Sequence, residues 1–342
     1  MITVGIVGFG LSGRYLQAPF FLKNPNFKLK TIVTRHQNPT AIYPSVSKAE
    51  SLDELISDAE IDLISLCSPN ETHFDYAQKC LLAGKHILVE KPFTSTTEEA
   101  KILFDLGRKV GKHIFIFQNR RFDSDFLTVK KVIESGILGE LWQFEAHFNR
   151  YKPILNPKKW KELPNPANGI LYDLGSHILD QTLVLFGDPL SIAGDRAVSG
   201  EVFTQREGSD IDDAFEVRLN YGRLKVLLKS SLLVRADTPR YVIHGTLGSF
   251  IKYGIDVQED HLKLQNMMPT DYGFGIEPID NQGHIHINQN GITIKGRVET
   301  ELGNWMPIFQ NICETINGTA QPFITENQIL AQMRILEKVK KG

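Results

Sequence analysis

Cysteine is scarce in this sequence: Cys67, Cys80 and Cys313 are the only three among 342 residues. The count is odd and no pair has C-x-x-C spacing, so the pattern indicates neither a disulfide framework nor a zinc site. Free thiols are typical of a reducing compartment, and the apolar strand pattern of residues 1–7 leaves no room for a signal peptide. We therefore expect a cytoplasmic protein.

An excess of charge of one sign is also missing, since 38 Lys and Arg residues face 40 Asp and Glu residues, a formal net charge of -2. This balance gives no electrostatic reason to expect a nucleic acid or an anionic membrane as a partner. No apolar run approaches the roughly 20 residues that a membrane-spanning helix needs. A small molecule is the expected partner.

What remains is an ordinary globular composition, with 42% hydrophobic and 23% charged residues. A chain of 342 residues exceeds what one hydrophobic core usually organises, so two domains are expected. Up to residue 118, short apolar runs alternate with amphipathic stretches, which is typical of βαβ units in a parallel sheet. The expected strands are residues 3–7, 29–34, 63–66, 87–89 and 114–117.

Helix boundaries in this first half carry their own signals. Asn70 precedes a helical pattern over residues 71–83, and Gly84 follows it as a stop. Ser95, with Glu98 three residues later, has the spacing of a capping box, and Gly111 is the expected stop of that helix. We therefore expect a doubly wound α/β domain over residues 1–120.

The pattern changes after residue 117, with one more helix at residues 126–135 and an alternating strand near 141–149. Alternating runs at residues 214–220, 225–233 and 241–245 are separated by turn residues and predict an antiparallel sheet. Helical patterns at residues 169–186 and 327–341 can cover one of its faces. We therefore expect an α+β domain with a largely antiparallel open sheet over residues 121–342. Residues 254–300 carry no regular structure that the pattern assigns.

A glycine-rich turn follows the first strand, and its residues satisfy G-x-G-x-x-G: Gly8, Phe9, Gly10, Leu11, Ser12 and Gly13. The string alone is weak, and three loop glycines in a fold that binds nothing is the alternative. Its position after a strand and before an amphipathic segment at residues 14–22 favours a Rossmann domain. There the glycines permit a tight turn, close approach of the backbone to a pyrophosphate, and packing of the helix on the sheet.

The cofactor type is normally set at the end of the second strand, where an acidic residue accepts the ribose hydroxyls of NAD. Here the chain reads Thr34, Arg35 and His36, without an acid. Arg35 can pair with a 2′-phosphate and stack on adenine, so we expect NADP(H) in preference to NAD(H), which stays possible. The alternative is that Arg35 is an ordinary solvated charge.

Glu90 and Lys91 stand at the carboxyl end of the fourth expected strand, the edge where open α/β sheets bind ligands. A lysine there can donate to a substrate oxygen and stabilise the negative charge that develops on it. The alternative is a surface lysine in a turn between a strand and a helix.

Asp173 and His177 are four residues apart in a helical pattern, so both are expected on one helix face. A neutral histidine can accept the proton of an alcohol as its hydride leaves, and a neighbouring carboxylate can orient the ring. A core histidine satisfied by a helical aspartate is the ordinary alternative. Metal binding by these two with Asp180, or by His284 and His286, is not expected, because three or four convergent ligands are needed.

Taken together, the motifs resemble those of the glucose-fructose oxidoreductase / inositol dehydrogenase / rhizopine-catabolism family over nearly the whole chain. The matching segments are residues 8–13, residues 69–73 leading into 83–92, and residues 173–177. Within the family the chain is most similar to the NADP-dependent scyllo-inositol dehydrogenase subgroup, through residues 118–126, 148–153 and 169–173.

The resemblance implies roles for individual residues. Lys91, Asp173 and His177 become the catalytic trio, and Glu90 joins Lys91 near the nicotinamide ribose. The remaining residues implied in the cofactor cleft are Ser68, Pro69, Asn70, His73, Asn119 and Arg120. Candidate substrate contacts, for which a structural role is an equal alternative, are Arg150, Tyr151 and Trp160. The resemblance also implies a homodimer or homotetramer formed through the open face of the second sheet.

The expected reaction is a hydride transfer between NADP(H) and a secondary hydroxyl or ketone of a cyclitol or sugar. His177 takes the hydroxyl proton, Asp173 holds His177, and Lys91 stabilises the oxygen. The alternative from another class is a sensor that binds a dinucleotide without chemistry. The presence of all three polar residues favours the enzyme.

Overall fold

The computed structural model describes residues 1–35 and 37–341, without the side chains of residues 159 and 160. The chain divides into two compact units. The first contains Met1–Asn119, Gln258–Phe274 and Asn304–Glu326, and the second contains Arg120–Val257, Gly275–Gly303 and Asn327–Gly342. The division is therefore discontinuous in sequence, whereas the sequence pattern predicts one boundary after residue 120.

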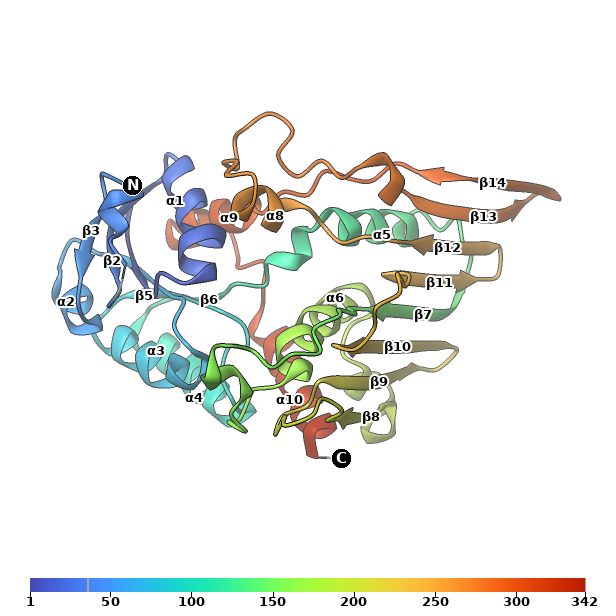
Figure 1. Cartoon of the computed structure of the whole chain (residues 1–342), viewed down its shortest axis with the longest axis horizontal. Helices are drawn as coiled ribbons and strands as arrows, with labels where there is room; N and C mark the ends of the chain where they lie inside the picture. Colours follow the sequence, from blue (N-terminus) through green and yellow to red (C-terminus); the bar gives the residue numbers. More distant parts are fainter. Residues whose placement is uncertain (36, 342) are drawn as a thin grey trace. The chain divides into compact units, whose positions relative to one another are not determined.

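The first unit is built on a six-stranded parallel sheet in the order β3-β2-β1-β4-β5-β6 (Figure 1). This is the strand order of a dinucleotide-binding Rossmann domain, which confirms the predicted fold. Its strands are β1 (Ile2–Val7), β2 (Phe27–Val33), β3 (Ser47–Ala49), β4 (Leu63–Leu66), β5 (His86–Val89) and β6 (Ile114–Ile116). All five predicted strands match to within two residues at each end, and β3 is additional.

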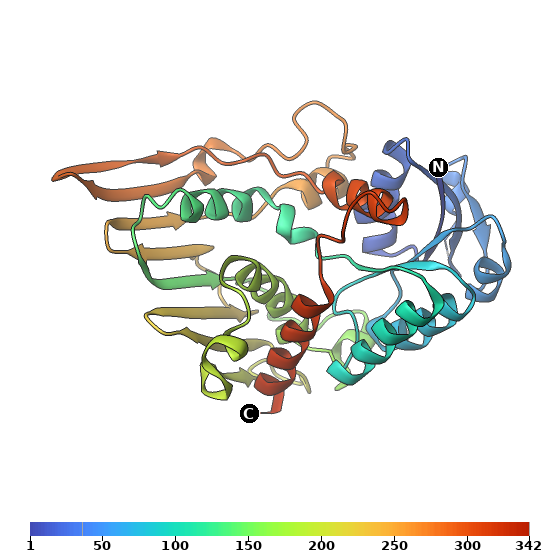
Figure 2. The ribbon, with the colours of Figure 1, turned by 180° about the vertical axis from the view of Figure 1, so that it is seen from behind.

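Helices lie on both faces of this sheet (Figures 1 and 2). α3 contacts both α2 and α4, and α1 contacts α9. The handedness of the connections explains why the helices lie on both faces. The chain moves from β1 to β2 in one direction along the sheet and from β3 to β4 in the other, and right-handed connections then place their helices on opposite faces. The helices are the π-helix η1 (Ser12–Gln17), α1 (Ala18–Lys23), α2 (Leu52–Ser57), α3 (His73–Leu82), α4 (Thr97–Val110), α8 (Gln258–Lys263) and α9 (Met306–Ile316).

An aromatic cluster explains why a late segment of the chain belongs to the first unit. Phe20 of α1 stacks on Phe309 of α9, with ring centroids 5.0 Å apart and an interplanar angle of 4°. Phe21 meets the same ring edge-on at 4.9 Å, and Trp305 lies 5.9 Å from Phe20. Buried aromatic pairs of this kind add to the gain from apolar burial, so α9 is an integral part of this core.

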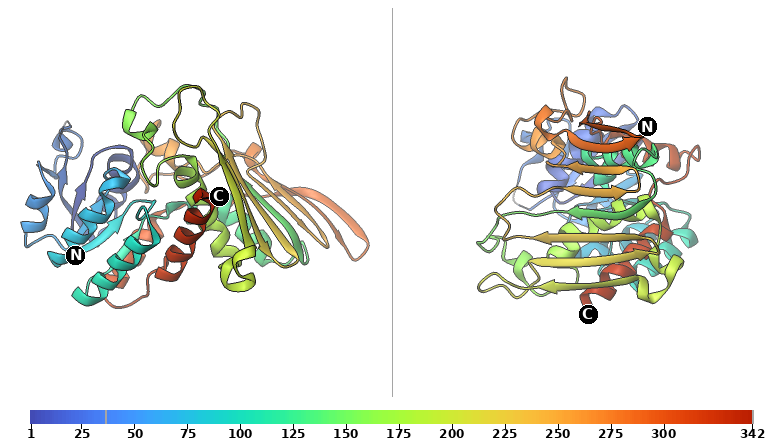
Figure 3. Two further views of the ribbon diagram at one scale, coloured as in Figure 1. Left: turned by 90° about the horizontal axis from the view of Figure 1, so that it is seen from below. Right: turned by 90° about the vertical axis from the view of Figure 1, so that its right-hand side faces the viewer.

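The second unit contains an eight-stranded mixed sheet in the order β14-β13-β12-β11-β7-β10-β9-β8 (Figure 3). β7 and β10 are parallel and the other neighbours are antiparallel, so the prediction of a largely antiparallel sheet is confirmed. The strands are β7 (Leu141–His147), β8 (Val198–Phe203), β9 (Ala214–Tyr221), β10 (Leu224–Ser231), β11 (Tyr241–Gly245), β12 (Gly248–Lys252), β13 (Gly283–Gln289) and β14 (Ile292–Val298).

Helices cover one face of this sheet, and within the described residues no helix covers the other face (Figure 3). They are α5 (Ser124–Glu134), the π-helix η6 (Leu171–Gly175), α6 (Ser176–Phe186), α7 (Pro189–Ala193) and α10 (Glu326–Lys341). Short 3₁₀ turns complete the chain at Pro39–Ala41, Asn70–Thr72, Asn119–Phe122, Lys159–Glu162, Asp195–Ala197 and Ile279–Asn281.

Two expectations from the sequence were wrong in detail. The capping box that begins α4 is formed by Thr96 and Glu99, one residue later than the Ser95 and Glu98 pair of the prediction. Residues 254–300, for which no regular structure was assigned, contain α8, β13 and β14. The β13–β14 hairpin was not predicted because most of its residues are exposed on both faces, so its sequence lacks the alternation of a half-buried strand.

Candidate active site

The glycine turn connects β1 directly to the π-helix η1. Gly8 has φ +99°, and a Cβ there would lie 2.6 Å from the carbonyl oxygen of Cys67, so the turn requires glycine on two counts. A Cβ on Gly13 would overlap the carbonyl oxygen of Gly8, which explains the close return of the helix onto the turn. At Gly10, by contrast, a Cβ would meet no atom within 4 Å. Gly8 and Gly13 are thus packed closely against backbone atoms, while the space beside Gly10 is open.

The side chains between these glycines have different environments. Phe9 is buried and its ring meets that of Tyr43 edge-on at 6.1 Å. The Tyr43 hydroxyl donates to the carbonyl of Arg14 at 2.8 Å, and burial raises the pKa of Tyr43 to about 12. Leu11 is exposed. Phe9 therefore supports the turn from behind, while Leu11 lies at the surface.

Glu90 is fixed by side chains of the π-helix η1. The Ser12 hydroxyl and the Gln17 amide both donate to Oε1 of Glu90, Gln17 at 2.9 Å, and Gln17 Nε2 also lies 3.2 Å from Ser12 Oγ. Ser12 and Gln17 are five residues apart, which is the hydrogen-bond spacing of a π-helix; in an α-helix they would point in different directions. The π-helical turn therefore brings two donors to one carboxylate oxygen.

A further hydrogen bond anchors Gln17 itself, whose side chain is fully buried. The Ser65 hydroxyl of β4 donates to Gln17 Oε1 at 2.5 Å. Burial raises the pKa of the Glu90 carboxyl, and the hydrogen bonds from Ser12 and Gln17 and the charge of Lys91 act against that rise. This chain of hydrogen bonds from Ser65 through Gln17 to Glu90 holds the residue that precedes Lys91.

Lys91 is half-buried at the end of β5, and its backbone N–H donates to Glu90 Oε2 at 3.2 Å. The peptide bond between Lys91 and Pro92 is cis. His73, at the start of α3, lies between this segment and the segment after β4. Its Nδ1 is 2.9 Å from the carbonyl oxygen of Pro92 and its Nε2 is 3.1 Å from that of Ser68. His73 thus connects two of the predicted cofactor-binding segments.

Burial lowers the pKa of His73, and the carbonyl groups of Pro92 and Ser68 oppose that change. A neutral imidazole carries one N–H and can donate to only one of the two carbonyls at a time. The other predicted residues of this segment follow directly: Pro69 precedes the 3₁₀ turn that begins with Asn70, and Ser68 Oγ lies 2.6 Å from Thr72 Oγ1.

The predicted cofactor-selecting residues lie just beyond β2. Thr34 donates its backbone N–H to Ala49 of β3 at 3.2 Å, and the Arg35 side chain is exposed. The third predicted residue, His36, lies outside the described residues. Arg35 is therefore available to solvent at the carboxyl edge of the sheet.

Asp173 and His177 belong to the second unit and lie on one continuous helical segment. Asp173 is in the π-helix η6 and His177 in α6, one turn later. Asp173 is the one exposed residue between residues 170 and 180. His177 is buried, with 6% of its surface exposed, and the centre of its ring lies 6.4 Å from that of Phe148. The predicted i,i+4 pair therefore exists on a helix, but at a junction between π and α geometry. Lys91 belongs to the other unit.

Phe148, at the end of β7, is surrounded by cations. The guanidinium carbons of Arg120, Arg150 and Arg240 lie 5.2, 5.1 and 4.1 Å from the centre of its ring. Arg120 donates to Asp123 at 2.9 Å and is part of the second unit, whereas its neighbour Asn119 closes the first. Arg120 and Arg150 thus contribute to the environment of the His177 ring.

The remaining candidate substrate contacts, Tyr151 and Trp160, follow β7 in the sequence. Tyr151 is exposed, accepts a hydrogen bond from Arg235 at 2.7 Å and stacks under its guanidinium at 4.2 Å. The side chain of Trp160 lies outside the described residues. Tyr151 therefore belongs to an exposed segment that Arg235 holds in place.

Asp180, considered above as a metal ligand, has a different partner. It binds Arg121 through two hydrogen bonds of 2.7 and 2.6 Å, and both side chains are buried. Gln181 donates to the carbonyl of Arg120 at 2.7 Å. In the described part of the chain no three His, Cys, Asp or Glu side chains are grouped to hold a metal ion. These contacts fix α6 to the residues that follow Asn119.

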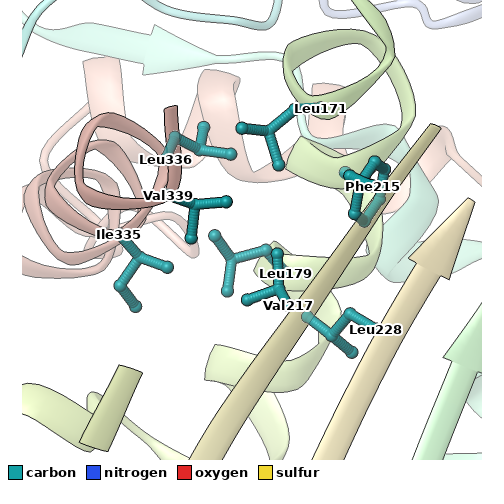
Figure 4. Close-up of a pocket in the computed structure, with 9 residues that line it drawn as sticks. Leu171, Leu179, Phe215, Val217, Leu228, Ile335, Leu336 and Val339 are labelled. Carbon is teal, nitrogen blue, oxygen red and sulfur yellow. The ribbon is translucent and has the colours of Figure 1, made fainter. Parts of the chain in front are cut away.

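The other side of the same helix packs into apolar surroundings (Figure 4). Leu171 and Leu179 face side chains of β9, β10 and α10 across a small apolar gap. Its other lining residues are Gly175, Phe215, Val217, Leu228, Ile335, Leu336 and Val339. The gap is a packing space of the core beneath the helix and offers no polar group to a ligand.

Comparison with known proteins agrees with this arrangement. Residues 2–118 match the model of an oxidoreductase family with an NAD-binding Rossmann fold, GFO/IDH/MocA, and residues 126–251 match the C-terminal domain of the same family. The chain belongs to the GFO/IDH/MocA family. As a member of that family it is an oxidoreductase.

Several relatives of this GFO/IDH/MocA protein align over its full length. The uncharacterized oxidoreductase YhhX of Escherichia coli is 38% identical over 99% of this chain and 96% of its own. The scyllo-inositol 2-dehydrogenase (NADP(+)) IolW of Bacillus subtilis is 35% identical over 98% of this chain and 92% of its own. A solved structure of the oxidoreductase yvaA of Bacillus subtilis has a TM-score of 0.92 at 34% identity, covering 100% of this chain and 97% of that one.

The first unit of this family member fits a nicotinamide dinucleotide. The open side of Gly10 leaves room for a phosphate at the turn, and the helical segment from Ser12 to Lys23 begins there. Ser68, Asn70 and Glu90 follow the neighbouring strands at the same sheet edge, where such ligands bind. Among the described residues no helix is long and apolar enough to cross a membrane.

Sequence reasoning missed several residues that support the candidate residues within each unit. Gln17 and Ser65 orient Glu90, and Arg240 supports Phe148 with a hydrogen bond to Asp125 at 3.1 Å. A buried polar residue in an otherwise apolar helix pattern was the available signal for Gln17. No sequence signal pointed to Arg240, because its partners are distant in the chain.

Proposed function

We propose that this protein catalyses reversible hydride transfer between NADP(H) and a secondary hydroxyl or ketone of a cyclitol or sugar. The observation that carries the proposal is the pair Asp173 and His177 on one helix, where a single carboxylate reaches the surface within an otherwise buried stretch. Family membership and the glycine turn support the use of a nicotinamide cofactor. The NADP-dependent inositol dehydrogenase among the relatives supports the substrate class.

The chemistry is divided among three residues. His177 accepts the hydroxyl proton of the alcohol, and Asp173 orients the imidazole for that transfer. The ammonium of Lys91 donates to the same oxygen and stabilises its negative charge. A nicotinamide dinucleotide held by the glycine turn would supply the hydride acceptor. Arg150, Tyr151 and Trp160 are proposed contacts for the other hydroxyl groups.

Turnover measurements on single variants test this assignment. Lys91→Ala or His177→Ala should lower kcat by a factor of about 100 or more, because each removes a group that acts in the transition state. NADPH binding, measured by fluorescence titration, should survive in both. Lys28→Ala and His244→Asn are matched controls, since Lys28 is exposed on β2 and His244 contacts Ser249 of the neighbouring strand at 2.7 Å. Near wild-type turnover in either test variant would contradict the assignment.

The cofactor preference rests on Arg35, which is exposed at the end of β2. The ratio of kcat/KM for NADPH to that for NADH should exceed one and should fall in Arg35→Ala. An equal ratio in the variant and the wild type would show that Arg35 does not set the cofactor preference.

A panel of keto-inositols and sugars identifies the substrate and separates an enzyme from a sensor. Tight NADPH binding without turnover across the panel would favour a dinucleotide-binding regulator of the same fold. The cytoplasm and a homodimer or homotetramer complete the proposal, and sedimentation velocity of the purified protein tests the assembly.

A further inference from the structure

The start of the helix that carries Asp173 and His177 is held by Asp212, a residue 41 positions away from Leu171. The backbone carbonyl of Asp212 accepts the N–H of Ile170 at 3.0 Å, and its carboxylate Oδ2 accepts the N–H of Leu171 at 2.8 Å. The first N–H groups of any helix lack partners within the helix. Asp212 therefore caps this helix from another part of the chain.

Gly169 makes this contact possible. Its φ is +101°, and a Cβ built on it would overlap the carboxylate of Asp212. Any other residue at this position would both strain the backbone and displace the carboxylate. The segment before the helix is thus shaped to admit Asp212 at close range.

Lys340 of α10 is the charge partner of Asp212. Its ammonium binds Asp212 Oδ1, the carboxylate oxygen that does not bind the helix. The Asp212 side chain is 1% exposed and that of Lys340 is 36% exposed. A carboxylate this deeply buried requires a compensating charge, and each of its oxygens has one partner of its own.

α10 supports the same helix at two further places (Figures 2 and 4). The Gln332 amide donates to the carbonyl of Ser176 at 2.7 Å. Ile335, Leu336 and Val339 line the apolar gap beneath Leu171 and Leu179. α10 therefore binds the residue that caps the start of this helix, and it contacts the helix itself at its π-to-α junction and along its back.

We propose that Asp212 is a positioning residue for Asp173 and His177, with Lys340 as its charge partner. The inference rests on the proposed function, in which those two residues act on the substrate. Asp173 follows Leu171 by two residues, and its own N–H donates to the carbonyl of Gly169 at 3.0 Å. A shift of the capped turn therefore moves the Asp173 carboxylate directly, and errors near 1 Å in such groups cost up to about 100-fold in rate.

Two double variants separate the capping hydrogen bond from the charge. Asp212→Asn with Lys340→Met keeps an oxygen that can accept from Leu171, and Asp212→Leu with Lys340→Met has nearly the same volume and no acceptor. Both lack the ion pair, so neither leaves a lone charge in the core. They differ in the side-chain amide, whose oxygen is the acceptor that the inference concerns.

The expected result is a split between the two variants in kcat. The Asn variant should stay within about threefold of the wild type, and the Leu variant should fall at least about tenfold, with the Kd for NADPH unchanged in both. The pH profile of kcat should shift in the Leu variant only, because the environment of the acid and base groups changes. Equal kcat and equal pH profiles in the two variants would overturn the inference.

A variant that keeps the charge covers the case in which the Leu variant does not fold. Asp212→Glu retains both the carboxylate and the pair with Lys340 but places the oxygens one methylene further out. It should lower kcat at an unchanged Kd for NADPH, and wild-type kcat in this variant would also overturn the inference.

Amide hydrogen exchange keeps this inference distinct from the proposed function. Exchange at residues 170–173 should accelerate in the Leu variant relative to the Asn variant, whether or not the protein turns over a given substrate. If exchange responds while His177→Ala retains full turnover, the cap exists but the catalytic assignment fails. If exchange does not respond, Asp212 does not hold the helix start and the inference fails by itself.

Discussion

Replacing Gln17 with leucine tests the buried chain that holds Glu90. Gln17 is fully buried and its amide connects the Ser65 hydroxyl, at 2.5 Å, to the Glu90 carboxylate, at 2.9 Å. Leucine has a similar size and no hydrogen-bonding group. The substitution therefore removes these two hydrogen bonds, and the longer one to Ser12 Oγ at 3.2 Å, without opening a large cavity.

The magnitude follows from the partners that are left behind. A hydrogen bond to an ionised group is worth about 2 kcal/mol net, and a buried hydroxyl without its acceptor costs about 1 kcal/mol. Gln17→Leu should therefore lower the free energy of unfolding by about 3 kcal/mol. Urea unfolding of the purified protein measures this change.

The same substitution should change the titration of Glu90. Burial raises the pKa of this carboxyl, and the Gln17 amide is one of the groups that oppose the rise. Without that amide the pKa of Glu90 rises further, so the protonated form persists to higher pH. The acid limb of the pH profile of kcat should therefore move to higher pH in Gln17→Leu.

Gln310 provides the matched control. Its amide donates to Glu314 at 2.9 Å, the same length as the bond from Gln17 to Glu90, but Gln310 is exposed. Gln310→Leu should change the free energy of unfolding by less than about 0.5 kcal/mol, since water replaces the lost partner. Equal losses in the two variants, or a stable Gln17→Leu protein with an unchanged pH profile, would refute the reasoning.

Three further predictions concern packing, charge and pH. Gly175→Ala places a Cβ 3.0 Å from the Phe215 ring, so it should cost about 1–3 kcal/mol in the free energy of unfolding, and Phe215→Leu in the same chain should recover part of it. Arg121→Met leaves a buried carboxylate unpaired and should cost about 3–5 kcal/mol, against under about 1 kcal/mol for Arg334→Met, whose ion pair is half exposed. Burial lowers the pKa of His86 to about 4, so the unfolded chain binds the extra proton and stability should fall as the pH drops from about 6.5 to about 4. Urea unfolding across this range should show a weaker pH dependence in His86→Asn, and an unchanged dependence would exclude His86 as its source.

Much of the first unit was predictable because its strands are buried on both faces. The run at residues 63–66 is Leu-Ile-Ser-Leu and all four residues are buried, so the apolar run matches the strand. The capping box was misplaced by one residue because Ser95 and Thr96 both precede a glutamate by three positions. The helix begins at the residue that allows Ala100 and Leu103 to be buried in the core, and the capping motif itself does not contain that information.

The return of the chain to the first unit could not be predicted from the sequence. α9 is an amphipathic helix whose apolar face fits either unit by pattern alone. Its place is decided by Phe309, which meets Phe20 and Phe21 of α1. Nearly 290 residues separate these rings, and no local signal carries such a contact.

The candidate site divides in the same way. Lys91, Asp173 and His177 were identified from motifs, because each chemistry-bearing residue sits in a short segment with recognisable spacing. Their supports were not, because Asp212 and Lys340 are 128 residues apart. The prediction of the catalytic trio as a functional unit stays a prediction, to be tested by the variants described above.

The two π-helical turns show why the spacing argument was only partly sufficient. η1 follows the glycine turn and η6 contains Asp173, and in each unit a carboxylate binds the π-helical segment. Glu90 binds the side chains of η1, and Asp212 binds the backbone at the start of η6. An α-helical repeat of 3.6 residues places Ser12 and Gln17 on different faces, whereas the wider π-helical turn brings their side chains together. A π-helical turn is less favourable than an α-helical one, so it persists where other contacts hold it. Those contacts come from Glu90 and Asp212, and removing either carboxylate should return its helix toward α geometry and displace the polar groups that the turn presents.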